Sequence, residues 1–308
     1  METSPNGEVL KSRGAATGSP DQRSGADMAK GSFFSEVDEM KTRIISGAVL
    51  AAIALAAILI GGVVLVAVLL FCAVVGMYEL MKALGVFDEG TNNNAVAAAA
   101  FAGAVVYYIL LGVFHGKYFG ETAAIVVIAV MAVYVACFPK LKSEQAVFSC
   151  FSFLYVGFML SFIYLIRIEE GGIVSVWLVF LSSWVADTAA YFTGMKLGKH
   201  KMTPVLSPKK TWEGAIGGIV GAGAAGILFS VLFDDARFPL EYLLICMVGA
   251  VISIFGDLAA SAIKREKGIK DYGTLIPGHG GIMDRFDSVI FVAPGIYFLT
   301  RLFLTRGL

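Results

Sequence analysis

Long apolar runs separated by short polar connections make up most of the chain after about residue 41. A helix needs about 20 mostly apolar residues to cross a membrane, and several runs reach that length. We therefore predict an all-α, polytopic integral membrane protein with about nine transmembrane helices. Two of them share the run 44–84, which Gly61–Gly62 divides by a tight turn. The others are expected at 95–114, 121–138, 145–167, 172–195, 212–233, 239–264 and 285–305.

Composition agrees with a membrane protein and limits the kinds of partner. Hydrophobic residues form 57% of the 308 residues and charged residues 16%, and the mean hydropathy is +0.78. The formal net charge is zero, so nothing predicts binding to nucleic acid. Residues 1–40 contain few large apolar residues, which predicts a disordered cytoplasmic tail. No apolar core lies near Met1, which argues against a signal peptide. The transmembrane domain is expected over 41–308.

The distribution of Lys and Arg predicts the orientation in the membrane. With the N-terminus in the cytoplasm, 19 of the 24 basic residues fall in the tail or on the cytoplasmic side of the expected spans. Cytoplasmic loops are enriched in such residues. The segments 196–210 and 265–283 then face the cytoplasm, and the expected location is a bacterial inner membrane.

Two features have structural interpretations. The four cysteines (Cys72, Cys137, Cys150 and Cys246) lie in apolar runs and are expected to be buried free thiols. The run Gly221–Gly226 matches G-x-G-x-x-G, but it lies inside an apolar helix rather than between a strand and a helix. Close packing of helices through small residues is the better interpretation. Such faces also make a homodimer a candidate assembly.

The stretch Asp257–Asp287 concentrates polar chemistry between two apolar runs. It contains five acids, three lysines, two arginines and one histidine. Asp257, Ser261 and Lys264 are spaced i, i+4, i+7 and share one helix face. Asp284 and Asp287 open the next helix. Two helix ends would present carboxylates, a hydroxyl and cations to one volume, which suits metal-assisted chemistry on phosphates.

The loop inside this stretch is rich in glycine. Gly273, Gly278, Gly280 and Gly281 allow positive φ angles and a close approach to a ligand. His279 is a candidate metal ligand, phosphate donor or turn residue, and these alternatives stay open.

Three features elsewhere are candidates for the same site. Asp187 lies inside an expected span, four residues from both Ser183 and Tyr191, and must be paired or face a cavity. The basic segment 196–210 ends at Thr211, which can cap the next helix. Ser207, Lys209 and Lys210 are assigned to binding a phosphate of lipid or nucleotide. Glu79 has two interpretations, a functional acid or an interfacial acid near a helix terminus, and the second is favoured.

Several motifs together resemble one enzyme family. They are Ser261-Ala-Ile-Lys-Arg, Lys270-Asp271, Gly273, Pro277, His279-Gly-Gly and Asp284-Arg-Phe-Asp287, with Asp187-Thr-Ala-Ala-Tyr-Phe-Thr-Gly and Ser207-Pro-Lys-Lys-Thr-Trp-Glu-Gly upstream. This pattern is similar to the signature of the phosphatidate cytidylyltransferases (CDP-diacylglycerol synthases). It covers the second half of the chain by motif and the first half by hydropathy alone.

The resemblance implies a reaction of CTP with phosphatidic acid that yields CDP-diacylglycerol and pyrophosphate. It implies Mg²⁺ as cofactor, in a one-metal or two-metal site, with Asp257 and Asp284 as ligands. The residues expected in catalysis are Asp257, Lys264, Arg265, Asp284 and Asp287. The residues expected to bind substrate are Asp187, Tyr191, Ser207, Lys209, Lys210, Ser261, Lys267, Lys270, Asp271, His279 and Arg285.

Other classes of protein are less consistent with the sequence. An ion-coupled transporter would also place acids in the membrane, but it does not need a dense loop of glycines and cations, and no internal repeat is evident. A purely structural protein leaves the buried acids unexplained. A CDP-alcohol phosphotransferase would carry a D-G-x-x-A-R type motif, which is absent from the sequence.

Overall fold

The computed structural model describes residues 46–87, 94–276 and 280–304. Within this part, eight helices are long and apolar enough to cross a membrane, in agreement with the predicted polytopic all-α fold. Single helices form α2 (Gly62–Ala83), α3 (Ala95–Val113), α4 (Phe119–Cys137), α10 (Trp212–Phe233), α11 (Pro239–Glu266) and α12 (Met283–Phe303). The predicted tail lies outside the described residues.

Two further spans are built from shorter pieces that continue one another. The first, Ser143–Ile168, joins α5 (Ser143–Ser152), the π-helix η1 (Phe153–Phe158) and α6 (Phe162–Ile168). The second, Gly172–Leu197, joins α7 (Gly172–Ser175), α8 (Trp177–Phe180), η2 (Leu181–Val185) and α9 (Ala186–Leu197). Short π-helical segments inside α-helices are often found at functional sites. The segment η2 ends two residues before Asp187.

The predicted turn at Gly61–Gly62 is confirmed. Their φ angles are 68° and 51°, a conformation that glycine adopts without steric cost. The turn follows the helix Ser46–Ile60, which is shorter than a full span in its described part. Arg167 Nε donates to the Ile58 carbonyl at 2.9 Å and so binds the end of this helix. The first of the nine predicted spans therefore corresponds to this shorter helix, and the other eight correspond to the eight long helices.

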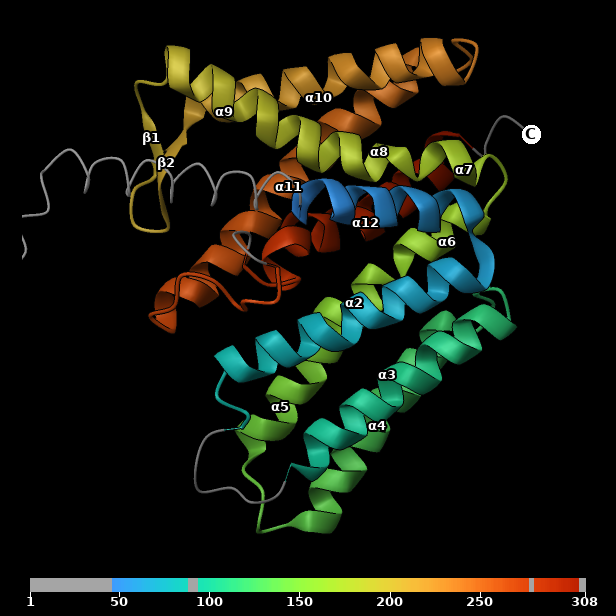
Figure 1. Cartoon of the computed structure of the whole chain (residues 1–308), viewed down its shortest axis with the longest axis vertical. Helices are drawn as coiled ribbons and strands as arrows, with labels where there is room; N and C mark the ends of the chain where they lie inside the picture. The colour runs from blue at the N-terminus through green and yellow to red at the C-terminus, as the bar shows by residue number, and fades with distance from the viewer. Residues whose placement is uncertain (1–45, 88–93, 277–279, 305–308) are drawn as a thin grey trace, which may run out of the picture.

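The helices form two groups joined by α2, α6 and α12 (Figure 1). In one group, α3 packs against α2, α4 and α5. In the other, α10 packs against both α9 and α11. Helix α12 lies against α11 on one side and α6 on the other. Helix α12 also contacts α2, so it bridges the two groups, and the geometry of a site at its first turn depends on both.

The glycines of α10 bring helices close together, as predicted. A Cβ on Gly217 would lie 2.4 Å from Thr193 Oγ1, and one on Gly221 would lie 2.6 Å from the Ala189 Cβ. Both neighbours belong to α9, so this part of the stripe packs within the chain. The predicted homodimer therefore gains no support from it and stays a prediction.

The segment between α9 and α10 forms a β-hairpin, which the sequence analysis did not predict. Strand β1 (Lys201–Thr203) pairs antiparallel with β2 (Ser207–Thr211). The hairpin is a small exception to the all-α prediction. The predicted cap is confirmed, because the Gly214 amide donates to Thr211 Oγ1 at 3.1 Å. Glu213 stabilises the base of the hairpin, because its carboxylate accepts hydrogen bonds from the backbone amides of Lys199 and His200.

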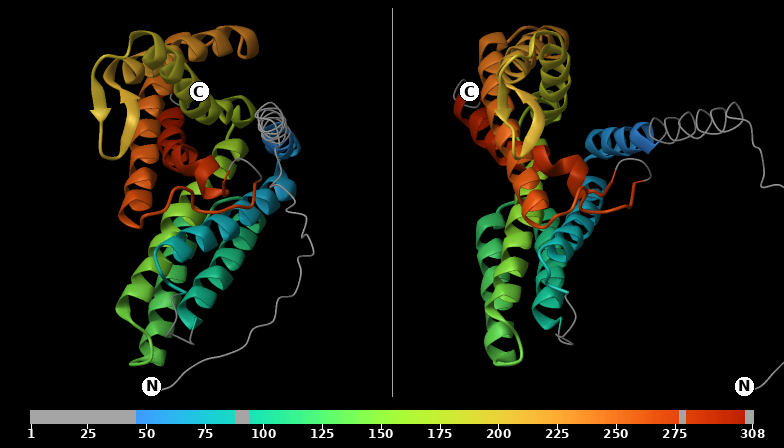
Figure 2. Two further views of the ribbon diagram at one scale, coloured as in Figure 1. Left: turned by 60° about the vertical axis from the view of Figure 1, so that its left-hand side comes forward. Right: turned by 90° about the vertical axis from the view of Figure 1, so that its left-hand side faces the viewer.

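The hairpin lies beside the C-terminal part of α11, as both views in Figure 2 show. Arg265 Nε donates to the Leu206 carbonyl at 3.4 Å across this contact. The hairpin and the loop after α11 are thus at the same end of the helices, as the charge pattern predicted.

The prediction for the cysteines is correct in part. All four are free thiols, and Cys72 and Cys246 are buried. Cys137 and Cys150 are only half-buried, because their apolar helices turn part of their surface outward.

Candidate active site

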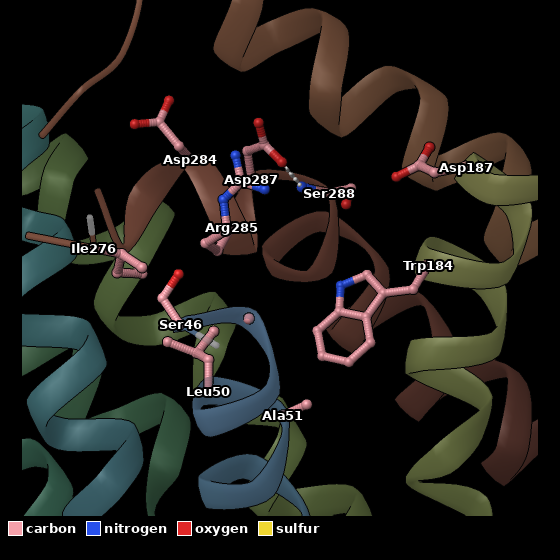
Figure 3. A pocket seen from close by; sticks show the side chains of 11 residues that line it. Ser46, Leu50, Ala51, Trp184, Asp187, Ile276, Asp284, Arg285, Asp287 and Ser288 are labelled. Carbon is pink, nitrogen blue, oxygen red and sulfur yellow. Dashed lines mark hydrogen bonds between the residues drawn. The ribbon is translucent and has the colours of Figure 1, made fainter. Parts of the chain in front are cut away.

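Two cavities meet at Asp187 of α9. One lies between α9, α12 and the helix Ser46–Ile60, and the other lies between α9, α10, α11 and the hairpin. The first has a volume of about 330 Å³. Its polar wall comes from Asp187 of α9 and from Asp284, Arg285 and Asp287 of α12 (Figure 3). Its apolar wall is formed by Leu50, Ala51 and Trp184. A molecule with a charged end and an apolar body would fit such a cavity.

The second cavity has a volume of about 360 Å³. Lys209, Lys210 and Tyr191 line it together with Asp257. Asp187 lines both cavities. The prediction that Asp187 faces a cavity is therefore confirmed. Ser183, one turn earlier, donates instead to the Val179 carbonyl at 2.9 Å.

Asp257 receives its partners from two elements. Its carboxylate forms an ion pair with Lys210 of the hairpin, and Ser261 Oγ donates to Asp257 Oδ1 at 3.3 Å. The predicted common face of Asp257 and Ser261 is thus correct. The pairing with Lys210 attaches the hairpin to α11 and gives the partly buried carboxylate a counter-charge.

Asp284 is held by three donors and is 8% exposed. Its Oδ2 accepts from the amides of Tyr272, at 2.8 Å, and Gly281, at 3.0 Å. Its Oδ1 accepts from Lys264 Nζ at 3.0 Å. One carboxylate thus joins the loop to the first turn of α12 and to the end of α11.

Asp287 lies one turn further along α12 and faces the first cavity (Figure 3). Its Oδ1 accepts from the Ser288 amide at 2.8 Å, and its Oδ2 lies 3.9 Å from Lys264 Nζ. Lys264 therefore forms ion pairs with both Asp284 and Asp287. Its ammonium also lies 5.3 Å from the ring centroid of Tyr272. Burial raises the pKa of Tyr272 well above its usual value, so its hydroxyl stays neutral and donates to the Ala260 carbonyl.

Whether the carboxylates could take part in holding Mg²⁺ depends on how many of them lie together. In the part of the chain that the structure describes, no group of three or more His, Cys, Asp or Glu side chains could hold a metal ion. Mg²⁺ usually takes one or two carboxylates and fills its other positions with phosphates and water. Carboxylates that are paired with lysines fit that arrangement, because a divalent cation can replace the ammonium groups as counter-charge.

Several predicted site residues lie away from the two cavities. Arg265 contacts the hairpin, and Lys267 forms an ion pair with Glu266 at 3.3 Å. Lys270 and Asp271 are exposed on the loop, and Ser207 pairs with Thr203 in the hairpin. The structure does not bring these five to the cavity walls. His279 lies outside the described residues, as do Pro277 and Gly278.

Glu79 lies near the C-terminal end of α2, as predicted, but its contacts were not predicted. It is 5% exposed, and it accepts hydrogen bonds from the backbone amides of Ile282 and Met283. The available signal was a lone acid in the otherwise very apolar α2. A buried carboxylate needs donors, and here the donors are backbone amides at the start of α12.

Comparisons with known proteins agree with the geometry. The model of the cytidylyltransferase family matches residues 41–303. The phosphatidate cytidylyltransferase of Bacillus subtilis (strain 168) is 30% identical over 276 residues, covering 86% of this chain and 99% of that protein. The enzyme of Thermotoga maritima is 30% identical over 280 residues, covering 86% and 98%. That of Staphylococcus haemolyticus is 42% identical over 153 residues, covering 49% and 57%. A match over this much of the chain shows that the protein belongs to the cytidylyltransferase family.

Proposed function

We propose that this protein is a phosphatidate cytidylyltransferase, which transfers CMP from CTP to phosphatidic acid and releases pyrophosphate. The observation that carries the proposal is the position of Asp187 between two cavities that each combine cations and carboxylates with an apolar wall. One cavity has a polar end and an apolar wall, which suits a lipid phosphate. The other has two lysines, which suit a polyphosphate.

The reaction joins two anions. An oxygen of the lipid phosphate attacks the α-phosphorus of CTP, and the bond from this phosphorus to the oxygen that bridges to the β-phosphate breaks. Pyrophosphate leaves with that oxygen and the electron pair. The attacking phosphate is already ionised near neutral pH, so no general base is needed. Cations that offset charge on the phosphates are the main requirement.

The chain supplies such cations on both sides of the carboxylates. Lys209 and Lys210 line the second cavity, and we assign them to the phosphates of CTP. Arg285 lines the first cavity and is assigned to the lipid phosphate. Lys264 holds Asp284 and lies near Asp287, which keeps the first turn of α12 in place.

We further propose that Asp257 and Asp284 hold Mg²⁺, with Asp287 close by. Asp284 would have to release Lys264 from Oδ1, because its Oδ2 already accepts two amides. The metal, when bound, would offset the charge that develops on pyrophosphate. The released lysine would then be free to contact a phosphate.

The orientation and location follow from the charge pattern. We propose that both cavities open toward the cytoplasm of a bacterial cell from its inner membrane, where CTP is available. The acyl chains would then stay in the lipid while the phosphate enters the first cavity. A homodimer stays a candidate assembly.

One assay tests the proposed function directly. The purified protein in detergent is incubated with phosphatidic acid, Mg²⁺ and CTP that is labelled either at the α-phosphorus or at the γ-phosphorus. We expect lipid-soluble label from the α-labelled CTP alone, and none without phosphatidic acid. If no label becomes lipid-soluble with any divalent metal, the protein is not a cytidylyltransferase for this lipid, and transport becomes the better hypothesis.

A further inference from the structure

Glu79 is a buried acid on α2 that makes contact with the far end of the chain. The helix is very apolar, and Glu79 lies near its C-terminal end, one turn before Ala83. Its carboxylate accepts from the Met283 amide at 2.8 Å and from the Ile282 amide at 3.2 Å. These are backbone groups at the start of α12, more than two hundred residues later in sequence.

The two amides belong to the N-terminal turn of α12. The first amides of any helix lack partners within the helix, and a side chain usually caps them from the preceding residue. Here that residue is Ile282, which makes no capping hydrogen bond with its side chain. Glu79 therefore replaces a local cap with a carboxylate from another helix, and its charge suits the positive end of the α12 dipole.

Two glycines of the loop make room for this carboxylate. A Cβ on Gly281 would lie 2.4 Å from both oxygens of Glu79, and one on Gly273 would lie 2.1 Å from Oε1. Neither glycine has a positive φ. Their role is the close approach of backbone to the carboxylate, not a special conformation.

Glu79 and Asp284 accept hydrogen bonds from different backbone amides around the start of α12. Glu79 takes the amides of residues 282 and 283, while Asp284 takes those of Tyr272 and Gly281. Together the two carboxylates accept from the three consecutive amides of residues 281–283. Because Asp284 and Asp287 are both on the first turn of α12, the placement of this turn decides where their oxygens lie.

We propose that Glu79 is a positioning residue, which fixes the first turn of α12 so that Asp284 and Asp287 face their cavity. It acts through the backbone of residues 281–283 and touches neither cavity. This inference rests on the proposed function, because the two aspartates matter only if they take part in the reaction.

The test is a double-mutant cycle between Glu79→Ala and Gly281→Ala, with kcat and both KM values measured on folded protein. We expect Glu79→Ala to lower kcat by roughly tenfold to a hundredfold, the usual cost of removing a partner that orients a ligand. Gly281→Ala should be comparably harmful, because its methyl group displaces the carboxylate. In the Glu79→Ala background the same methyl group has space, so the double variant should be no worse than Glu79→Ala alone.

A matched control separates positioning from general loosening of the fold. Gln145 is also buried, and its Nε2 donates across elements to the Val86 carbonyl at 3.1 Å. Gln145→Ala should lower the thermal midpoint while leaving kcat of the folded protein unchanged. The same loss of midpoint in Glu79→Ala with unchanged kcat would overturn the proposal.

Hydrogen exchange gives a readout that does not need turnover. In Glu79→Ala, a peptide covering 280–290 should exchange faster, while peptides from α3 and α10 stay as in the wild type. Unchanged protection in 280–290 would mean that Glu79 does not hold this turn. If the wild type fails to label lipid, the proposed function fails, but this exchange experiment still decides the role of Glu79.

Discussion

Lys210 of the hairpin forms an ion pair with Asp257 of α11. Both side chains are partly buried, at 25% and 28% exposure, so solvent screens the pair only in part. A second contact, from Arg265 to the Leu206 carbonyl, lies on the same side. The basic segment after α9 is therefore not a free cytoplasmic loop. It is attached to α11 at the level of a candidate active-site carboxylate.

Lys210→Ala should reduce turnover more than the loss of another lysine in the same hairpin. The substitution removes a cation from the second cavity and leaves Asp257 without its ion pair. We expect kcat/KM for CTP to fall about tenfold or more, or roughly 1.4 kcal/mol. Lys201→Ala is the control, because Lys201 is exposed in β1 and lines neither cavity. An equal fall in kcat/KM for the two substitutions would mean that Lys210 acts only through the overall positive charge of the hairpin.

Asn in place of the carboxylates tests the metal proposal. Asp257→Asn and Asp284→Asn keep size but remove charge, so turnover should fall about a thousandfold or more if the metal stabilises the transition state by several kcal/mol. Asp287→Asn should be less harmful. The measurement is CDP-diacylglycerol formation against Mg²⁺ concentration, with the elution profile in detergent as a check of folding. The exposed Asp235→Asn is the control, and near-normal rates in both main variants would refute the assignment.

Asp187→Asn should affect the use of both substrates, because the side chain lines both cavities. We expect a fall in kcat/KM for CTP and for phosphatidic acid, with normal elution in detergent. Ser183→Ala is the matched control on the same helix, since its hydroxyl is bonded within that helix. An effect on one substrate alone would show that Asp187 serves a single cavity.

Gly217→Ala should weaken the packing of α9 against α10. The added methyl group would meet Thr193, and overpacking of this kind typically costs about 1–3 kcal/mol. The thermal midpoint in detergent should therefore fall. Gly120→Ala, where a Cβ meets nothing within 4 Å, should leave it unchanged or slightly raised. The same midpoint for both variants would show that the α9–α10 contact is looser than described.

The orientation can be measured with cysteines placed at exposed positions on opposite sides. In a background with the native four replaced, Glu266→Cys should react with an impermeant reagent only from the cytoplasmic side. Arg237→Cys, in the connection between α10 and α11, should react only from the other side. The reverse pattern would contradict the predicted orientation and place the CTP site on the wrong side of the membrane.

Much of the fold follows from the sequence alone. The membrane spans depend on the length of apolar runs, and the turn at Gly61–Gly62 and the cap by Thr211 depend on residues that are close in sequence. These are local properties, so a reading of the chain can find them. The same holds for the shared face of Asp257 and Ser261, because helical spacing decides it.

The tertiary structure alone decided which distant groups meet. Hydropathy does not show how a helix is rotated about its axis, so it could not reveal that Glu79 points at the start of α12. Nor could it predict that the segment after α9 forms a hairpin whose Lys210 reaches Asp257. Both contacts join residues far apart in sequence. A carboxylate that is buried, as Glu79 is, or partly buried, as Asp257 is, needs hydrogen-bond donors or a counter-charge, and the packing of distant elements decides which groups come near it.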